Sequence, residues 1–185
     1  PEPFNIEAGV TILAVARRAA WGSAAFSQFL LNVSFPYLLR SQTVAVNSMA
    51  MGFAVWGRAA NAGTVSTPDN GRIYCGIGTW TATRSEAPPT IGTMSGSMRV
   101  DGGFRVASTS TSLATSVYPQ LVSSLILGQP STSTDVPWVG SIGEIRCFNV
   151  QLGTDDIFRE EGYLAWKWGL EGNLPSTHPY KTAPP

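Results

Sequence analysis

The sequence predicts an all-β fold, a sandwich of two antiparallel sheets, with one α-helix near the C-terminus. Many short apolar segments of strand length are separated by stretches rich in Gly, Pro, Ser and Thr. Only 13% of the 185 residues are charged while 43% are hydrophobic, which is unlike a disordered chain or an ordinary helical protein. This length fits one sandwich domain better than two small domains.

The predicted strands follow one another along most of the chain. Residues 10–16 are continuously apolar, short and β-branched, which is typical of a strand buried on both faces. Pro36 cannot donate to a sheet ladder, so it separates two strands within the apolar stretch 29–46. Further strands are expected at 51–57, at 72–78 after a turn at 68–71, at 121–127 and at 139–148, the last two parted by an exposed loop at 128–137.

The clearest hairpin covers residues 98–106. Met98 and Val100 alternate with polar neighbours, as do Phe104 and Val106 on the returning strand. A three-residue loop at 101–103 would place Val100 opposite Phe104, so that both apolar sets reach the same face.

A helix is predicted over residues 155–168. Thr154 suits the N-cap because its hydroxyl can accept a hydrogen bond from an orphan amide, and Asp155 and Asp156 place negative charge at the positive end of the helix dipole. Gly169 suits the left-handed residue that follows the last turn.

The helix is expected to pack on the domain through one apolar face. Ile157, Leu164 and Trp168 recur at helical spacing. Trp168 and its neighbour Trp166 are therefore interpreted as packing residues that point inward.

The end of the chain resembles the closing segment of concanavalin A-like jelly rolls, specifically the laminin G-like domains of bacteriophage virion proteins and large bacterial surface proteins. The resemblance rests on the strand at 139–149, the helix, the run Leu-Ala-Trp-Lys-Trp-Gly-Leu at 164–170, Asn-Leu-Pro at 173–175 and His-Pro-Tyr at 178–180. It implies a structural motif made of Thr154, Asp155, Glu161, Tyr163, Trp166, Trp168, Gly169, His178 and Tyr180.

The resemblance implies one jelly-roll domain over residues 1–172. The remainder, 173–185, is expected to be an extended proline-rich tail that docks on the domain surface or leads to a partner. Because the chain starts at Pro1 without Met, we expect that something was removed upstream. Cys75 and Cys147 lie in apolar, strand-like runs, which favours two free thiols over a disulfide.

Composition and motifs argue against several classes of function. Twelve basic residues balance twelve acidic ones without a basic patch, so we expect no nucleic-acid partner. No apolar stretch is long enough to span a membrane. His178 is the sole histidine and is interpreted as a hydrogen-bonding anchor, and no G-x-S-x-G elbow occurs. We therefore expect no metal and no cofactor, although the resemblance leaves room for calcium at a sandwich rim.

Glycoside hydrolysis is also disfavoured, because the E-x-D-x-x-E pattern of concanavalin A-like glucanases is absent. Glu144 is the only carboxylate in its strand, and an ion pair with Arg146 on the same side accounts for it. Glu161 is assigned to the solvated side of the helix or to a contact beneath the sheet. The chain is thus predicted to be non-enzymatic.

Two functions remain from the sequence. The first is a structural virion module, a capsid decoration, head fibre or tail component, which has other virion proteins or further copies of itself as partners and which can adhere to host glycans. The alternative is a lectin-like carbohydrate-binding module of a secreted or cell-surface protein. The candidate glycan contacts are Trp80, Tyr118 and Trp138, which sit in or beside predicted loops where an aromatic ring could stack on a sugar.

Overall fold

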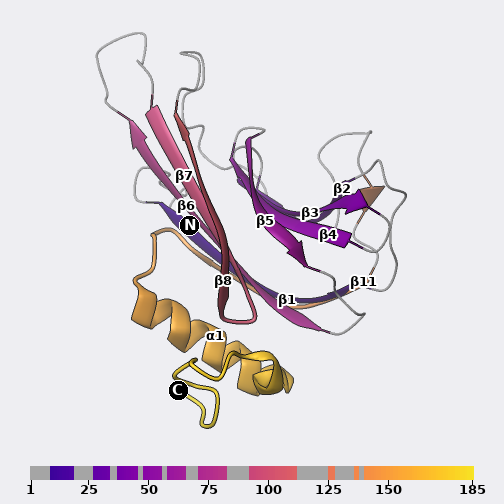
Figure 1. The fold of residues 1–185 in the computed structure, drawn as a ribbon, viewed down its shortest axis with the longest axis vertical. Helices are drawn as coiled ribbons and strands as arrows, with labels where there is room; N and C mark the ends of the chain where they lie inside the picture. The colour runs from indigo at the N-terminus through magenta and orange to yellow at the C-terminus, as the bar shows by residue number, and fades with distance from the viewer. Residues whose placement is uncertain are drawn as a thin grey trace.

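Antiparallel β-sheet makes up most of the described chain, and one α-helix follows it near the C-terminus (Figure 1). The computed structural model describes the backbone of residues 9–18, 27–33, 37–45, 48–55, 58–65, 71–82, 92–111, 125–127, 136–137 and 140–185. Side chains are described in residues 9–17, 71–78, 97–103 and 140–185. The predicted turn at 68–71 lies outside the described residues apart from Gly71, as do residues 121–124 of one predicted strand.

The first sheet has five described strands in the order β11-β1-β6-β7-β8. Their bounds are Val10–Arg18 for β1, Arg72–Ala82 for β6, Gly92–Val100 for β7, Gly103–Thr111 for β8 and Gly140–Phe148 for β11. All four pairs are antiparallel. Strand β1 pairs with β6 on one side and with β11, near the end of the chain, on the other.

A second group of strands is paired in the order β10-β2-β3-β4-β5, with β9 pairing to β2. The bounds are Ser27–Val33 for β2, Tyr37–Ala45 for β3, Ser48–Val55 for β4, Arg58–Val65 for β5, Leu125–Leu127 for β9 and Val136–Pro137 for β10. The strands predicted on both sides of Pro36 are present as β2 and β3, whereas β5 was not predicted. Two residues of the predicted loop 128–137 form β10, which runs parallel to β2.

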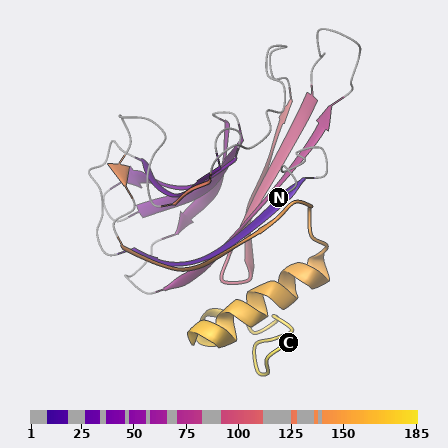
Figure 2. The same cartoon turned by 180° about the vertical axis from the view of Figure 1, so that it is seen from behind.

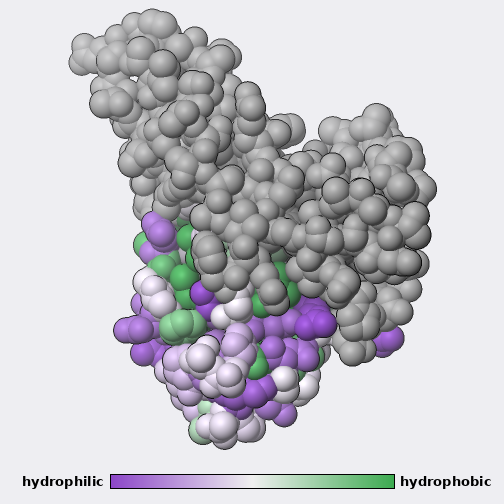
Figure 3. Space-filling model, in the orientation of Figure 1, coloured by the Kyte–Doolittle hydropathy of each residue, from purple (hydrophilic) through white to green (hydrophobic). Residues whose placement is uncertain are grey.

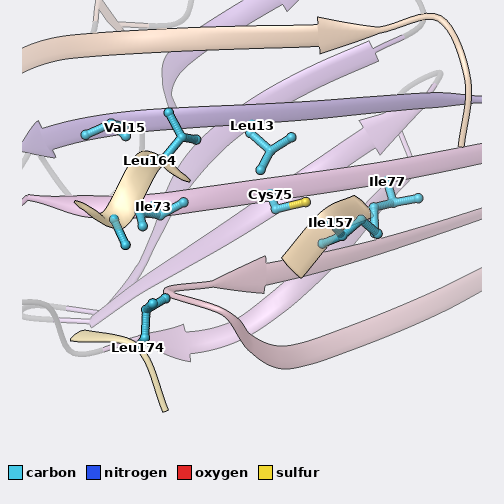
Figure 4. Close-up of a cluster of buried hydrophobic side chains, with 9 residues drawn as sticks. Leu13, Val15, Ile73, Cys75, Ile77, Ile157, Leu164 and Leu174 are labelled. Atoms are coloured by element: carbon cyan, nitrogen blue, oxygen red, sulfur yellow. The ribbon is translucent and has the colours of Figure 1, made fainter. Parts of the chain in front are cut away.

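Helix α1, Thr154–Trp168, lies across the outer face of the first sheet, on the side away from the second group of strands (Figures 1 and 2). Leu13, Ile73 and Leu164 are fully buried between the helix and this face (Figure 4). The other members of this core cluster are Val15, Cys75, Ile77, Ile157, Ala165 and Leu174, with Phe148, Leu152 and Leu170 packed against it.

Strand β1 is buried on both faces, as its continuous apolarity predicts. Side chains alternate along a strand, so Leu13 faces the helix while its neighbours Ile12 and Ala14 face the opposite side, and all three are fully buried. The pairing register places Cys75 opposite Leu13 and Cys147 opposite Ile12. The two cysteines therefore lie on opposite faces of the sheet, and both thiols are free, as predicted.

The β7–β8 hairpin has a two-residue loop, so the predicted three-residue loop is wrong. Asp101 and Gly102 both have positive φ, 50° and 76°, which is the geometry of a tight hairpin turn. Val100 consequently pairs with Gly103 rather than with Phe104, and a register shift between Met98 and Arg99 restores the pairing of Met98 with Val106.

Asp101 ties this turn to the neighbouring strand. Its carboxylate accepts hydrogen bonds from the Arg72 guanidinium at 2.6 Å and from the Ile73 backbone N–H at 2.9 Å. Its own backbone N–H donates to the Ile73 carbonyl at 2.8 Å. The side chain thus compensates the positive φ that an aspartate tolerates better than most residues.

Helix α1 begins one residue earlier than predicted, and Thr154 is not its N-cap. Gly153 holds that position without any side-chain capping bond, and its carbonyl accepts from the Ile157 N–H. The preceding chain is fixed instead by Thr11 of β1, whose hydroxyl accepts from the Leu152 N–H and donates to the Val150 carbonyl, both at 2.9 Å. Gly169 ends the helix in the left-handed conformation, as predicted.

The tail folds back beneath the helix and is not extended as predicted. A short 3-10 helix, Glu171–Asn173, is followed by two turns, in which the His178 N–H donates to the Pro175 carbonyl and the Lys181 N–H to the His178 carbonyl. Leu174 is buried in the core cluster. The tail therefore contributes to the core as well as covering the helix.

Candidate functional site

The most buried carboxylate of the described chain lies where the helix meets the sheet. Glu161 of α1 is 0% exposed, and its two carboxylate oxygens accept from the Nε and Nη2 atoms of Arg99 on β7 at 2.7 and 3.0 Å. Arg99 also donates to the Gly102 carbonyl at 2.6 Å and lies over the Phe158 ring, 5.0 Å from its centroid. The alternative in which Glu161 makes a contact beneath the sheet is therefore the observed one.

These charges also affect the ionisation of their neighbours. Burial acts to lower the pKa of Arg99, but the hydrogen bonds and charge of Glu161 outweigh it, so this pKa is raised. Burial, followed by the Glu161 charge, raises the pKa of the Cys75 thiol well above its ordinary value. Cys75 therefore stays neutral beneath an intact ion pair.

His178 holds the tail against the same cluster. It is 5% exposed, its Nδ1 accepts from the Tyr180 N–H at 3.2 Å, and its ring packs edge-on against Phe158. Its Nε2 lies 3.4 Å from a Glu161 oxygen but without hydrogen-bond geometry. The ring also covers Gly102, where an added Cβ would lie 2.7 Å from His178 Cδ2. This histidine is therefore an element of packing, held out of reach of solvent.

Strand β11 is attached to the flank of the helix by two ion pairs. Glu144 pairs with Lys167 at 2.8 Å, and Arg146 pairs with Glu160 at 2.7 Å. The predicted ion pair between Glu144 and Arg146 is therefore wrong, because the helix lies above the strand and offers each a closer partner. Hydrogen bonding by Lys167 lowers the pKa of Glu144, and Glu144 in turn raises the pKa of Lys167.

Tyr163 lies on the same flank of the helix. It is 39% exposed, and the Arg146 guanidinium lies 4.9 Å from its ring centroid. Its hydroxyl accepts a hydrogen bond from Lys167 at 3.0 Å. Tyr163 thus links the two ion pairs of this flank.

Both terminal tryptophans are partly exposed, so the expectation that they point inward is wrong. Trp166 is 36% exposed and donates through Nε1 to the Tyr180 carbonyl at 2.9 Å, which ties the tail to the helix. Trp168 is 42% exposed and donates to Glu144 at 3.1 Å. Trp168 rests on Gly143 of β11 but keeps part of its surface open, and Trp166 contacts the tail rather than the sheet.

A small open cavity lies beneath this last turn, between α1 and the ends of three strands. Its volume is about 290 Å³. It is lined by Val15, Ala16, Arg17, Gly71, Ser141, Gly143, Trp168 and Leu170.

Figure 3 shows mainly hydrophilic residues over the exposed surface of the helix and tail, with hydrophobic residues where this part meets the rest of the molecule. Sequence reasoning did not find this cavity, because it depends on where the helix ends relative to the sheet.

The remaining candidate residues are placed only in part. Asp155 lies in the first turn of α1. Trp80 belongs to β6, but its side chain is not described, and Tyr118 and Trp138 lie outside the described residues. Across the described ranges there is no group of three His, Cys, Asp or Glu side chains that could hold a metal ion, and no helix there is long and apolar enough for a membrane span.

No family model matches the chain, and no curated protein is similar to it in sequence. Solved structures are similar in fold. A mutant of Trypanosoma rangeli sialidase that displays trans-sialidase activity aligns with a TM-score of 0.54 at 13% identity, covering 80% of this chain and 22% of the sialidase. The native heptameric SAP-like pentraxin from Limulus polyphemus aligns with a TM-score of 0.50 at 10% identity, covering 81% of this chain and 68% of the pentraxin.

The CBM40 of Ruminococcus gnavus IT-sialidase bound to α2,6 sialyllactose aligns with a TM-score of 0.47 at 14% identity, covering 80% of each chain. This chain thus spans about a fifth of the sialidase and about two thirds of the pentraxin. The alignments with the sialidase and the pentraxin show a similar β-sandwich fold, and at such identities they say nothing of ligands.

Proposed function

We propose that the chain is a non-enzymatic module of a virion, a laminin G-like jelly roll of two sheets that decorates a capsid or forms part of a head fibre or tail and adheres to host glycans. The observation that carries the proposal is the structural role of the C-terminal residues on which the resemblance rests. Glu161 binds the helix to Arg99 of the sheet, and Gly169 ends the helix. Trp166 and His178 hold the tail against the helix. The residues that resemble phage-type domains thus serve to close a scaffold.

A non-enzymatic role is supported by Glu160 and Glu161, the two helix carboxylates next to the sheet, because both are already engaged. General acid-base chemistry on a sugar needs two carboxyl groups about 5–10 Å apart that can reach substrate. Glu161 is sealed from solvent by Arg99, and Glu160 is paired with Arg146. His178 is buried and cannot reach a substrate either.

The virion assignment is tested on purified particles produced from the genome that encodes the chain. Mass spectrometry of gradient-purified particles should find the chain at constant stoichiometry, and immunogold labelling should place it on a head, fibre or tail. The assignment fails if the chain stays in the unassembled fraction, or if the recombinant chain never associates with particles that lack it.

The alternative function, a lectin-like module of a secreted or cell-surface protein, is supported by the half-exposed indole of Trp168 beside an open cavity. It predicts glycan binding without particle association. A glycan array with the wild-type chain and with Trp80→Ala, Tyr118→Ala and Trp138→Ala tests the loop residues that the sequence suggests. Repeating the array with and without Ca²⁺ tests the calcium that the resemblance allows.

A further inference from the structure

We infer that the cavity beneath the last turn of α1 is a saccharide subsite that takes one neutral pyranose ring, with Trp168 as the stacking platform. The inference rests on the proposed glycan adhesion and assigns it a place that the loop candidates do not cover. Trp168 and Leu170 form the roof, and the ends of β1, β6 and β11 form the floor.

The indole of Trp168 is held in one orientation before any ligand arrives. Its six-membered ring rests on Gly143, where an added Cβ would lie 3.0–3.1 Å from three ring atoms. Its Nε1 donates to Glu144, which Lys167 also fixes. A ring fixed by packing and a hydrogen bond loses little conformational entropy when a ligand stacks on it, which favours binding. Even so, the side chain remains 42% exposed.

The lining matches the two surfaces of a pyranose. A sugar ring has an apolar C–H face and a polar rim of hydroxyl groups. Val15, Ala16 and Leu170 supply apolar surface beside the indole, and Ser141 is a polar residue of the same lining. Because Glu144 is neutralised by Lys167, the neighbouring carboxylate does not select for a cationic ligand.

The size of the cavity limits the ligand to one ring. Its volume of about 290 Å³ is just below the range of about 300–1,000 Å³ that is usual for ligand sites, so it suits a small ligand. Further sugars of an oligosaccharide would extend into solvent through the open side.

Trp166 provides a matched control on the same helix. It is exposed to a similar degree, 36%, and its Nε1 is also hydrogen bonded. However, its ring lies on the side of the helix covered by the tail and does not line the cavity. A ligand that merely adsorbs to exposed indoles would affect both rings, whereas a ligand of the cavity would affect Trp168 alone.

The first test is an NMR titration of ¹⁵N-labelled protein with methyl glucopyranoside, galactopyranoside and mannopyranoside, observed at the indole N–H signals. Trp168→Phe and Trp166→Phe assign the two signals. We expect the Trp168 signal to move saturably with at least one sugar, with a Kd of the order of 1 mM, typical of weak recognition of a single ring. N-acetylphenylalanine amide, titrated in the same way, serves as a control ligand that is not a sugar. The inference is overturned if no sugar moves either signal, if both signals move together, or if the control ligand alone moves the Trp168 signal.

The second test uses variants on a glycan array. Trp168→Ala should reduce binding at least tenfold, and Trp166→Ala should leave it unchanged. Gly71→Ala places a methyl group in the cavity 3.4 Å from Leu170, an ordinary contact, so it should weaken binding in a chain whose urea midpoint is unaltered. If wild type binds and Trp168→Ala and Gly71→Ala bind equally well, the subsite is wrong and glycan adhesion stands. If wild type binds no glycan, both fail.

Discussion

Replacing Glu161 by Gln should destabilise the fold by about 3–5 kcal/mol, because it leaves the Arg99 charge buried without a counter-charge. The glutamine amide keeps one oxygen that can accept from Arg99, so one of the two charged hydrogen bonds is lost, at about 1.5–3 kcal/mol, and the unpaired buried charge accounts for the rest. Arg99 cannot relieve the strain by losing its proton, because a guanidinium stays protonated in proteins. Cys75 cannot supply the missing negative charge, because burial keeps its thiol neutral.

Urea unfolding measures this effect directly. With a slope of about 2 kcal/mol/M, the midpoint should fall by about 2 M, and the melting temperature by roughly 6–20 °C for a chain of this size. Glu160→Gln is the matched control, because its neighbouring ion pair with Arg146 is partly exposed and should contribute no more than about 1 kcal/mol. Equal losses for Glu160→Gln and Glu161→Gln would refute the reasoning. Arg99→Met combined with Glu161→Leu should cost less than either single change.

Other predictions concern the helix, its ion pair and one thiol. Helix propensity alone would make Gly162→Ala stabilising by about 1 kcal/mol, but the added Cβ would lie 2.6 Å from the side chain of Tyr180. We therefore expect urea unfolding to show a loss of stability of about 1–3 kcal/mol. Gly172→Ala, where the added Cβ meets no atom, is the control and should be neutral. Because the pKa of Glu144 is lowered in the folded state, its ion pair with Lys167 stabilises the fold above pH 4.5, and this stabilisation is lost as pH falls through the folded pKa. The difference in urea midpoint between wild type and Lys167→Met should therefore disappear at acidic pH. A difference that does not change with pH would contradict the role of this ion pair. Burial raises the pKa of Cys147 to about 11, so a thiol reagent at neutral pH should label it far faster in urea than in buffer, and equal rates would show that it is not buried.

Local chemistry explains why the ends of the helix were largely predictable from sequence. Gly169 ends it because a left-handed residue is needed there, and Asp155 and Asp156 lie in its first turn. Thr154 was misassigned as N-cap because the chain before the helix is fixed by Thr11, more than 140 residues earlier. A pattern confined to neighbouring residues carries no information on such a contact.

The hairpin error has a similar origin, on a shorter scale. Alternation of apolar residues suggested that Val100 faces Phe104, whereas the turn residues decide the register. Asp101 and Gly102 both accept positive φ, which permits a two-residue turn, and a bulge then brings the Met98 pairing back into register. Turn chemistry was the better guide here.

The burial of polar groups in the outer face follows from the helix that covers this sheet. Alternation in β7 puts Arg99 on the face opposite Met98 and Val100, a face that would be solvated in an uncovered sheet. Once α1 lies there, an arginine at that position requires a carboxylate, and Glu161 is the helical residue that supplies it. Thr11, fully buried on the same face, likewise uses its hydroxyl on the chain that leads into the helix. Polar residues on the outer face of the sheet therefore determine where the covering helix can pack. The position of α1, and with it the cavity beside Trp168, depends on Arg99 of β7 and Thr11 of β1, which are far from the helix in sequence.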